Sequence, residues 1–198
     1  YSKCKGIRSY NPLPKINSSS IDDAVRLINK AKKPFIVWGQ GVILGNAEDE
    51  FKSFVEKSGI PAAWTILGVS ALPTSHELNV GMVGMHGNYG PNLLTNECDL
   101  LVAIGMRFDD RVTGDPKTYA NQAKIIHLDI DPAEINKNIK VEVPIIGDCK
   151  ESLKLITEKI EKRSHEKWIS KFDDLMKIEF DKVINSDLNP SKKGLTMG

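Results

Sequence analysis

Cysteine and histidine are scarce in this chain of 198 residues, and those present are scattered. The three cysteines (Cys4, Cys98 and Cys149) form no Cys-x-x-Cys pair, and the four histidines are equally dispersed. These spacings do not fit a zinc site or a disulfide framework. We therefore expect no metal-binding set in the chain and a reducing compartment, the cytoplasm, around it.

Long apolar runs and an excess charge of one sign are also missing. No stretch approaches the roughly 18 apolar residues of a membrane-spanning helix, and residues 1–8 contain no apolar signal region. The formal net charge of +1 is too small to attract nucleic acid or an anionic membrane over a distance. With 40% apolar and 27% charged residues, the chain has the composition of a globular domain with neither partner.

The complete dinucleotide-binding fingerprint is absent as well. Gly39-Gln40-Gly41 is followed by three apolar residues, so the third glycine of Gly-x-Gly-x-x-Gly is lacking. No acidic residue ends a second strand about 20 residues later, as that motif requires. The chain also has no P-loop and no Gly-x-Ser-x-Gly elbow. These absences argue against a standard NAD dehydrogenase.

What the sequence does contain is a regular alternation of apolar strands and amphipathic helices. The expected strands cover 34–38, 60–65, 80–85, 100–104, 124–130 and 143–146. The expected helices cover 21–31 (capped by Ser20), 46–58, 91–96, 148–160 and 164–184. This order indicates a three-layer α/β domain, in which a mostly parallel sheet is covered on both faces. The last helical stretch follows a highly charged segment and is expected to be partly detached.

The run Gly-Met-Arg-Phe-Asp-Asp-Arg-Val-Thr-Gly at 105–114 directly follows the strongest strand candidate. Loops at the carboxyl ends of parallel strands are where open α/β sheets bind nucleotides. The planar guanidinium groups of Arg107 and Arg111 suit a diphosphate. Asp109 can accept hydrogen bonds from ribose or adenine, or hold a neighbouring arginine. The alternative is a surface loop of ion pairs, in which Asp109 and Asp110 are ionised partners rather than an acid–base pair.

Five segments with related composition are expected at this same edge of the sheet. They are 39–41, 65–68, 84–87, 105–111, and 127–131 with 147–148 beyond it. Glycine lets backbone N–H groups approach a phosphate closely. Each segment is a weak signal alone, but one long ligand lying across the strand ends would touch all of them. His86 stays open between a ligand contact and a turn or packing role, and His127 is expected to be structural.

Taken together, these motifs resemble the central domain of the large catalytic subunit of acetolactate synthase, a family of thiamine-diphosphate enzymes. The resemblance covers about residues 21–160. It rests on Ile60-Pro61-Ala62 and on segments 65–68, 83–87, 99–114, 123–138 and 147–148. The most specific part is Arg-Phe-Asp-Asp-Arg-Val-Thr-Gly at 107–114, which is associated with family members that hold FAD.

The resemblance implies a Rossmann-like central domain at 20–161 that holds FAD. It also implies a linker at 1–19 from a pyrimidine-binding domain, and a charged helical segment and linker at 162–198 toward a pyrophosphate-binding domain. Gln40 stands where the family usually has glycine, and Cys149 where valine is common. The implied FAD contacts are Gly39, Gln40, Gly41, Thr65, Ile66, Leu67, Gly84, Met85, His86, Gly105, Arg107, Asp109, Arg111, Val112, Asp129, Ile130, Gly147 and Asp148.

Enzymes of this family condense two pyruvates, or pyruvate and 2-ketobutyrate, with loss of carbon dioxide, in the biosynthesis of valine and isoleucine. Their catalytic glutamate and the Gly-Asp-Gly motif that holds magnesium and thiamine diphosphate have no match here. We therefore expect no catalytic residue and no metal ligand in this chain, which looks like a domain excised from a longer polypeptide and inactive alone. The implied partners are the flanking catalytic domains, further copies in a homo-oligomer, and a small regulatory subunit.

Two other functions stay open at this point. The chain can be a stand-alone nucleotide-binding module, for NAD or a similar molecule. It can also be a packing and assembly domain without a ligand.

Overall fold

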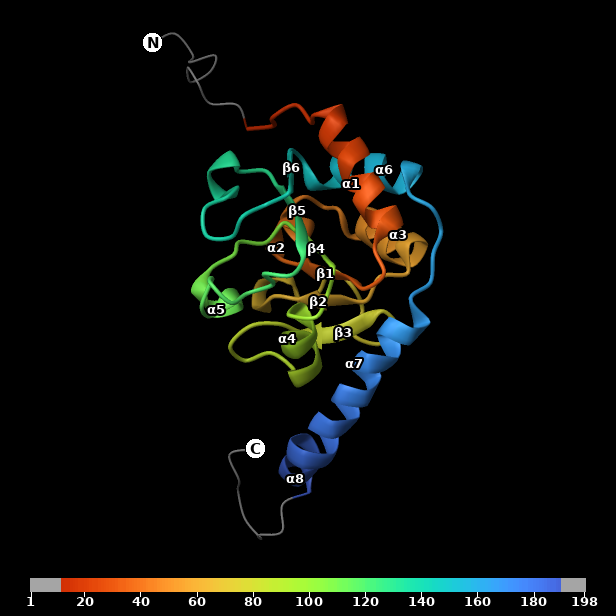
Figure 1. Ribbon diagram of the computed structural model, residues 1–198, viewed down its shortest axis with the longest axis vertical. Helices are drawn as coiled ribbons and strands as arrows, with labels where there is room; N and C mark the ends of the chain where they lie inside the picture. Colours follow the sequence, from red (N-terminus) through yellow and green to blue (C-terminus); the bar gives the residue numbers. More distant parts are fainter. Residues whose placement is uncertain (1–11, 190–198) are drawn as a thin grey trace, which may run out of the picture.

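A computed structural model describes residues 12–189 as an α/β fold built on one six-stranded sheet (Figure 1). All strand pairs are parallel, in the order β3-β2-β1-β4-β5-β6. Chain order therefore reverses direction between β1 and β4, which pair in register from Pro34–Leu100 to Trp38–Ile104. The strands are β1 (Pro34–Trp38), β2 (Ala62–Trp64), β3 (Asn79–Met82), β4 (Leu100–Ile104), β5 (Lys124–Asp129) and β6 (Val143–Ile146).

Helices cover both faces of this sheet, which confirms the predicted three-layer architecture. They are α1 (Ser18–Lys30), α2 (Gln40–Leu44), α3 (Glu48–Ser58), α4 (Tyr89–Thr95), α5 (Asp110–Thr113), α6 (Cys149–Lys159), α7 (Glu166–Glu179) and α8 (Asn185–Leu188). Short 3-10 turns lie at Ile66–Gly68 and Pro132–Glu134, and a π-helical turn at Phe180–Ile184 joins α7 to α8. None of the helices within residues 12–189 combines the length and apolar character that crossing a membrane requires.

Side chains alternate between two hydrophobic cores because successive strand residues point to opposite faces. Ile36 and Val102 pack under α1, α3 and α6, whereas Phe35 and Leu101 pack on the opposite face, where α4 lies. The strands are buried on both faces, which explains why their sequences are continuously apolar rather than alternating.

Most predicted elements exist, but several begin or end elsewhere. Helix α1 is capped by Asn17, whose Oδ1 accepts from the Ser19 N–H at 3.0 Å, and not by Ser20. Helix α3 begins after Ala47, because Asn46 has a left-handed φ of 47°. Strands β2, β3 and β5 end earlier than predicted, since their last apolar residues belong to loops at the sheet edge. Helix α2 was not predicted, and α4 begins before residue 91.

The first half of helix α7 belongs to the hydrophobic core that contains Phe35 and Leu101, and its second half leaves this core. Trp168 and Phe172 are buried against Phe35, and the Trp168 Nε1–H donates to the Pro34 carbonyl at 2.8 Å. Beyond them, Phe180 and other apolar side chains are exposed, and Figure 1 shows the helix leading away from the sheet toward α8. The expected detachment is therefore limited to the second half, and the core extends into α7.

Candidate functional site

An open trough runs along the carboxyl ends of the strands, across the point where the strand order reverses. Ligands of open α/β sheets bind in the crevice at such a point. The trough has a volume of about 510 Å³. It is lined by Gly39, Gln40, Gly41, Leu44, Thr65, Ile66, Leu67, Met82, Val83, Met85, His86, Gly105, Met106, Arg107, Asp109, Arg111, Val112, Asp129 and Ile130.

This lining brings together every residue of the predicted site except Gly84, Gly147 and Asp148. The predicted segments therefore lie along one edge of the sheet, where a single long ligand can contact them. Four further lining residues were missed, namely Leu44, Met82, Val83 and Met106. Leu44 is the last residue of the unpredicted helix α2. Val83 and Met106 directly adjoin predicted residues and Met82 lies two positions before Gly84, so their position beside the glycines was a usable signal.

Three glycines let the loops after β1 and β4 cross in backbone contact. A Cβ on Gly41 would lie 2.5 Å from Gly105 Cα, and a Cβ on Gly39 would lie 2.6 Å from the Gly105 carbonyl oxygen. Their N–H groups are already used: Gly39 donates to Ile104 O at 3.0 Å, Gly41 to Gly105 O at 2.8 Å, and Gly105 to Leu128 O at 2.8 Å. The expectation that these glycines offer N–H groups to a phosphate is wrong, because crossing of the loops requires them instead.

The positive side chains of the trough come from the loop after β4. The Arg107 and Arg111 side chains are 65% and 71% exposed. Arg107 Nη2 lies 3.5 Å from Asp109 Oδ2, and Arg111 Nε lies 4.0 Å from Asp110 Oδ1. The ion pairs of the alternative interpretation are thus present, but pairs this long and exposed contribute little. Both guanidinium groups keep donors that can bind an anion.

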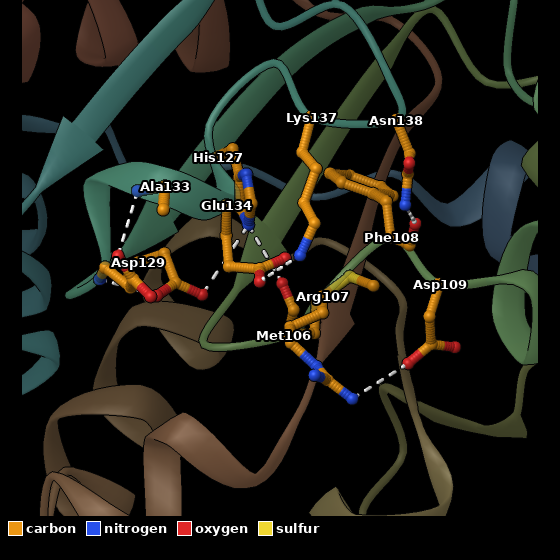
Figure 2. Close-up of polar contacts among 11 residues, drawn as sticks. Met106, Arg107, Phe108, Asp109, His127, Asp129, Ala133, Glu134, Lys137 and Asn138 are labelled. Atoms are coloured by element: carbon orange, nitrogen blue, oxygen red, sulfur yellow. Dashed lines mark hydrogen bonds and ion pairs between the residues drawn. The ribbon is translucent and has the colours of Figure 1, made fainter.

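Asp129 forms the acidic end of the trough, at the end of β5 (Figure 2). Its Oδ1 accepts from the Asp131 N–H at 2.9 Å, and its Oδ2 lies 3.8 Å from His127 Nε2. Burial raises the pKa of Asp129, although the hydrogen bond from Asp131 opposes this shift. A carboxylate with one oxygen fixed and the other at a trough can accept from a ligand hydroxyl.

His127 supports the site from below and does not line it. Its ring is fully buried, and Nε2 lies 2.9 Å from the Met106 carbonyl oxygen. The rings of His127 and Phe108 pack edge to face, with their centroids 5.0 Å apart. Because a carbonyl only accepts, Nε2 carries the proton, and burial lowers the pKa of this histidine. Figure 2 shows the same layer continuing to Asn138, whose Nδ2 donates to Phe108 O at 2.6 Å. The prediction of a structural role for His127 is confirmed.

Apolar side chains are exposed along the walls of the trough. Folded proteins seldom expose several large apolar groups side by side unless a ligand or partner covers them. The exposed fractions are 72% for Leu44, 68% for Ile66, 60% for Leu67, 62% for Met85 and 46% for Ile130. His86 is also exposed, so it is not a core packing residue. The walls therefore suit flat apolar rings, whereas the arginines suit negative charge.

The three predicted residues outside the lining serve the surrounding backbone. Gly147 N–H donates to Asp129 O at 3.0 Å and so ties β6 to the end of β5. Asp148 caps helix α6, with Oδ1 accepting from the Glu151 N–H at 2.9 Å. Gly84 has a left-handed φ of 107° and contacts the Arg111 carbonyl. Across residues 12–189, no cluster of histidine, cysteine and carboxylate side chains forms a candidate metal site.

Strand order and trough place the protein among doubly wound α/β domains with a ligand crevice at the strand crossover. The chain belongs more specifically to the family of thiamine pyrophosphate enzyme central domains, whose family profile matches residues 21–156.

Relatives with high similarity are acetolactate synthase large subunits. The chain is 50% identical over 149 residues to that of Corynebacterium glutamicum, covering 75% of this chain and 24% of the relative. It is 39% identical over 193 residues to that of Buchnera aphidicola subsp. Schizaphis graminum, covering 94% and 34%. A probable acetolactate synthase large subunit of Methanococcus aeolicus is 46% identical over 152 residues, covering 77% and 25%. The chain thus spans about a quarter to a third of these curated relatives.

Proposed function

We propose that the trough of this central domain holds FAD as a structural cofactor. The chemistry of the lining fits the molecule: two exposed guanidinium groups for the diphosphate, the Asp129 carboxylate for a ribose or the adenine, and apolar walls for the ring systems. The observation that carries the proposal is the convergence of these three groups, from separate loops, in one trough at the strand crossover.

Within this proposal, Arg107 and Arg111 bind the diphosphate, and Asp129 with Ile130 contacts the ribose or adenine end. Ile66, Leu67 and Met85 cover the faces of the rings. FAD takes no net redox part in the synthase reaction that the family resemblance implies. Its contribution in this chain is to join the loops after β1, β2, β4 and β5 into one surface and to brace neighbouring domains.

The whole protein, in this proposal, is an acetolactate synthase that condenses two pyruvates, or pyruvate and 2-ketobutyrate, in branched-chain amino-acid biosynthesis. This chain is its middle domain, with thiamine diphosphate and magnesium bound in flanking catalytic domains. The proposal further includes a homo-oligomer, a small regulatory subunit and a cytoplasmic location. Similarity to acetolactate synthase large subunits over most of the chain supports it.

Titration with FAD, FMN and NAD, followed by flavin fluorescence or calorimetry, tests the cofactor. FAD is expected to bind with a stoichiometry of one and to raise the temperature of unfolding, because a ligand that binds only the folded state stabilises it. Preferential binding of NAD would support the stand-alone module instead. A protein that binds none of the three would support the packing domain and contradict the cofactor proposal.

A further inference from the structure

Helix α4 controls the path of one wall of the trough through two asparagines. Asn88 is the residue directly before α4, and Asn92 lies within the helix. Asn88 Oδ1 accepts from the Met82 N–H at 2.9 Å. Asn92 bonds Gly84, two residues further along the segment that follows β3. The segment 82–86 contributes four lining residues, so its path decides the shape of that wall.

The Asn92 amide holds Gly84 by two hydrogen bonds at once. Its Oδ1 accepts from the Gly84 N–H at 2.9 Å, and its Nδ2 donates to the Gly84 carbonyl at 2.9 Å. Both the oxygen and the nitrogen of the amide are used, which fixes the orientation of the amide. The two bonds to Gly84 resemble those that join two residues of paired strands. Gly84 has a φ of 107°, a conformation that glycine adopts readily and other residues rarely do.

The next residue transmits this constraint to Arg111. Met85 N–H donates to the Arg111 carbonyl at 2.8 Å, and a Cβ on Gly84 would lie 2.6 Å from the same oxygen. Arg111 Nη1 also lies 3.9 Å from Met85 Sδ. Because little else packs against the largely exposed Arg111 side chain, the position of its backbone sets the region that the guanidinium group can reach. Asn92, Gly84, Met85 and Arg111 therefore form one connected series of contacts.

We propose that Asn92, which does not line the trough, is a positioning residue that holds Arg111 in place to bind the diphosphate of a dinucleotide. The inference rests on the proposed function for the identity of the ligand. It does not rest on it for the constraint, because the contacts that lead from Asn92 through Gly84 and Met85 to the Arg111 backbone are all made by this chain's own atoms.

Asn92→Asp tests this role with little change in size. The carboxylate still accepts from the Gly84 N–H but cannot donate, and it brings a negative oxygen against the Gly84 carbonyl. Asn96→Asp is the matched control, because it adds the same charge to the end of α4 and keeps the acceptor that Asn96 offers to the Ala120 N–H. FAD affinity is expected to fall about tenfold for Asn92→Asp and less than about twofold for Asn96→Asp.

A double-mutant cycle with Arg111→Ala separates positioning from a general structural effect. If Asn92 acts through Arg111, removal of Arg111 weakens FAD binding about tenfold or more in the native background but less than about threefold in the Asn92→Asp background. Additive losses would overturn the inference, since they would mean that Asn92 stabilises the fold without aiming this arginine. Asn92→Ala, which adds no charge, enters the same cycle if the Asp variant does not fold.

Amide hydrogen exchange of Met85, measured by NMR without ligand, gives an answer independent of FAD. Asn92→Asp is expected to speed this exchange at least about tenfold, because the Met85–Arg111 hydrogen bond opens more often. Unchanged exchange would overturn the positioning role even if FAD binds well. Faster exchange in a protein that binds no FAD would retain the constraint and contradict only the proposed function.

Discussion

At the residue scale, the two arginines of the 105–114 loop carry the positive charge of the trough, and the Arg111 carbonyl accepts a hydrogen bond from the Met85 N–H at 2.8 Å. Arg111→Ala is expected to weaken FAD binding by about 1–3 kcal/mol, the loss typical of a hydrogen bond to a charged group. The measurement is a fluorescence titration at fixed salt. Arg26→Ala is the matched control, because Arg26 is exposed on α1 and paired with Asp23 at 2.9 Å, away from the trough. Equal affinities of native and Arg111→Ala proteins would remove Arg111 from the site.

His127 makes the stability of the domain depend on pH. Burial lowers the pKa of His127 below its ordinary value of 6.5, so the folded state keeps the ring neutral where the unfolded chain takes up a proton. The free energy of unfolding is therefore expected to fall as the pH drops below 6.5. The pKa of His165 is lowered in the same sense by burial and by Arg163, and the raised pKa of Asp129 acts in the opposite sense.

His127→Gln isolates the histidine contribution, because an amide can still donate to the Met106 carbonyl. The variant should show a flatter loss of unfolding free energy between pH 7 and 5 in urea titrations, since the contribution of His127 is removed. His86→Gln, at an exposed position, is the control. A slope that is as steep in His127→Gln as in the native protein would contradict the assignment.

The glycines show what the sequence can and cannot predict about single residues. Gly39, Gly41 and Gly105 line the trough, as predicted, because glycine after a strand marks a close approach of backbone. In the structure, the backbone that approaches them is that of the neighbouring loop. The sequence indicates that a side chain at these positions would collide with neighbouring atoms. It does not indicate that these atoms belong to a segment more than sixty residues away, which only the fold brings near.

At the element scale, strands were easier to predict than helix ends. Strands β1, β4 and β6 begin and end at the predicted residues, because continuous apolar runs have sharp limits. Helix starts depend on which of several polar residues supplies the cap, and Asn17 has the competing neighbours Ser18, Ser19 and Ser20. Helix α2 was missed because its five residues carry too little periodicity, and its first glycine suggested a turn.

The buried first half of helix α7 and the exposed turn that follows this helix at Phe180 give a prediction within one continuous helical segment. Phe172→Ala is expected to lower the free energy of unfolding by about 3–5 kcal/mol, since it opens a cavity among Phe35, Trp168 and the sheet. Phe180→Ala, at a side chain with 45% exposure, should cost less than about 1 kcal/mol. Urea unfolding of both variants checks this, and equal costs would mean that α7 does not belong to the core.

At the scale of the whole molecule, the trough is proposed to bind a structural cofactor and not to form carbon–carbon bonds itself. The catalytic glutamate and the Gly-Asp-Gly motif of the family have no match in the sequence of this chain. This chain, supplied with pyruvate, thiamine diphosphate and magnesium, is therefore expected to form no acetolactate above the rate without protein. A colorimetric acetoin assay measures this. Turnover by this chain would mean that its residues contribute to catalysis directly.

The sequence by itself determined the fold class, the family and the segments that form the ligand edge. Apolar strands, the glycines after them and the Arg-Phe-Asp-Asp-Arg run are local patterns. Such patterns can be recognised in the sequence without knowledge of the fold. Only the tertiary structure decided which members of those segments face the trough, because Gly84 lies between two lining residues yet does not line the trough, and Gly147 and Asp148 serve backbone hydrogen bonds instead. It alone also revealed Asn92, whose two hydrogen bonds join a helix to a loop through contacts that no sequence spacing encodes.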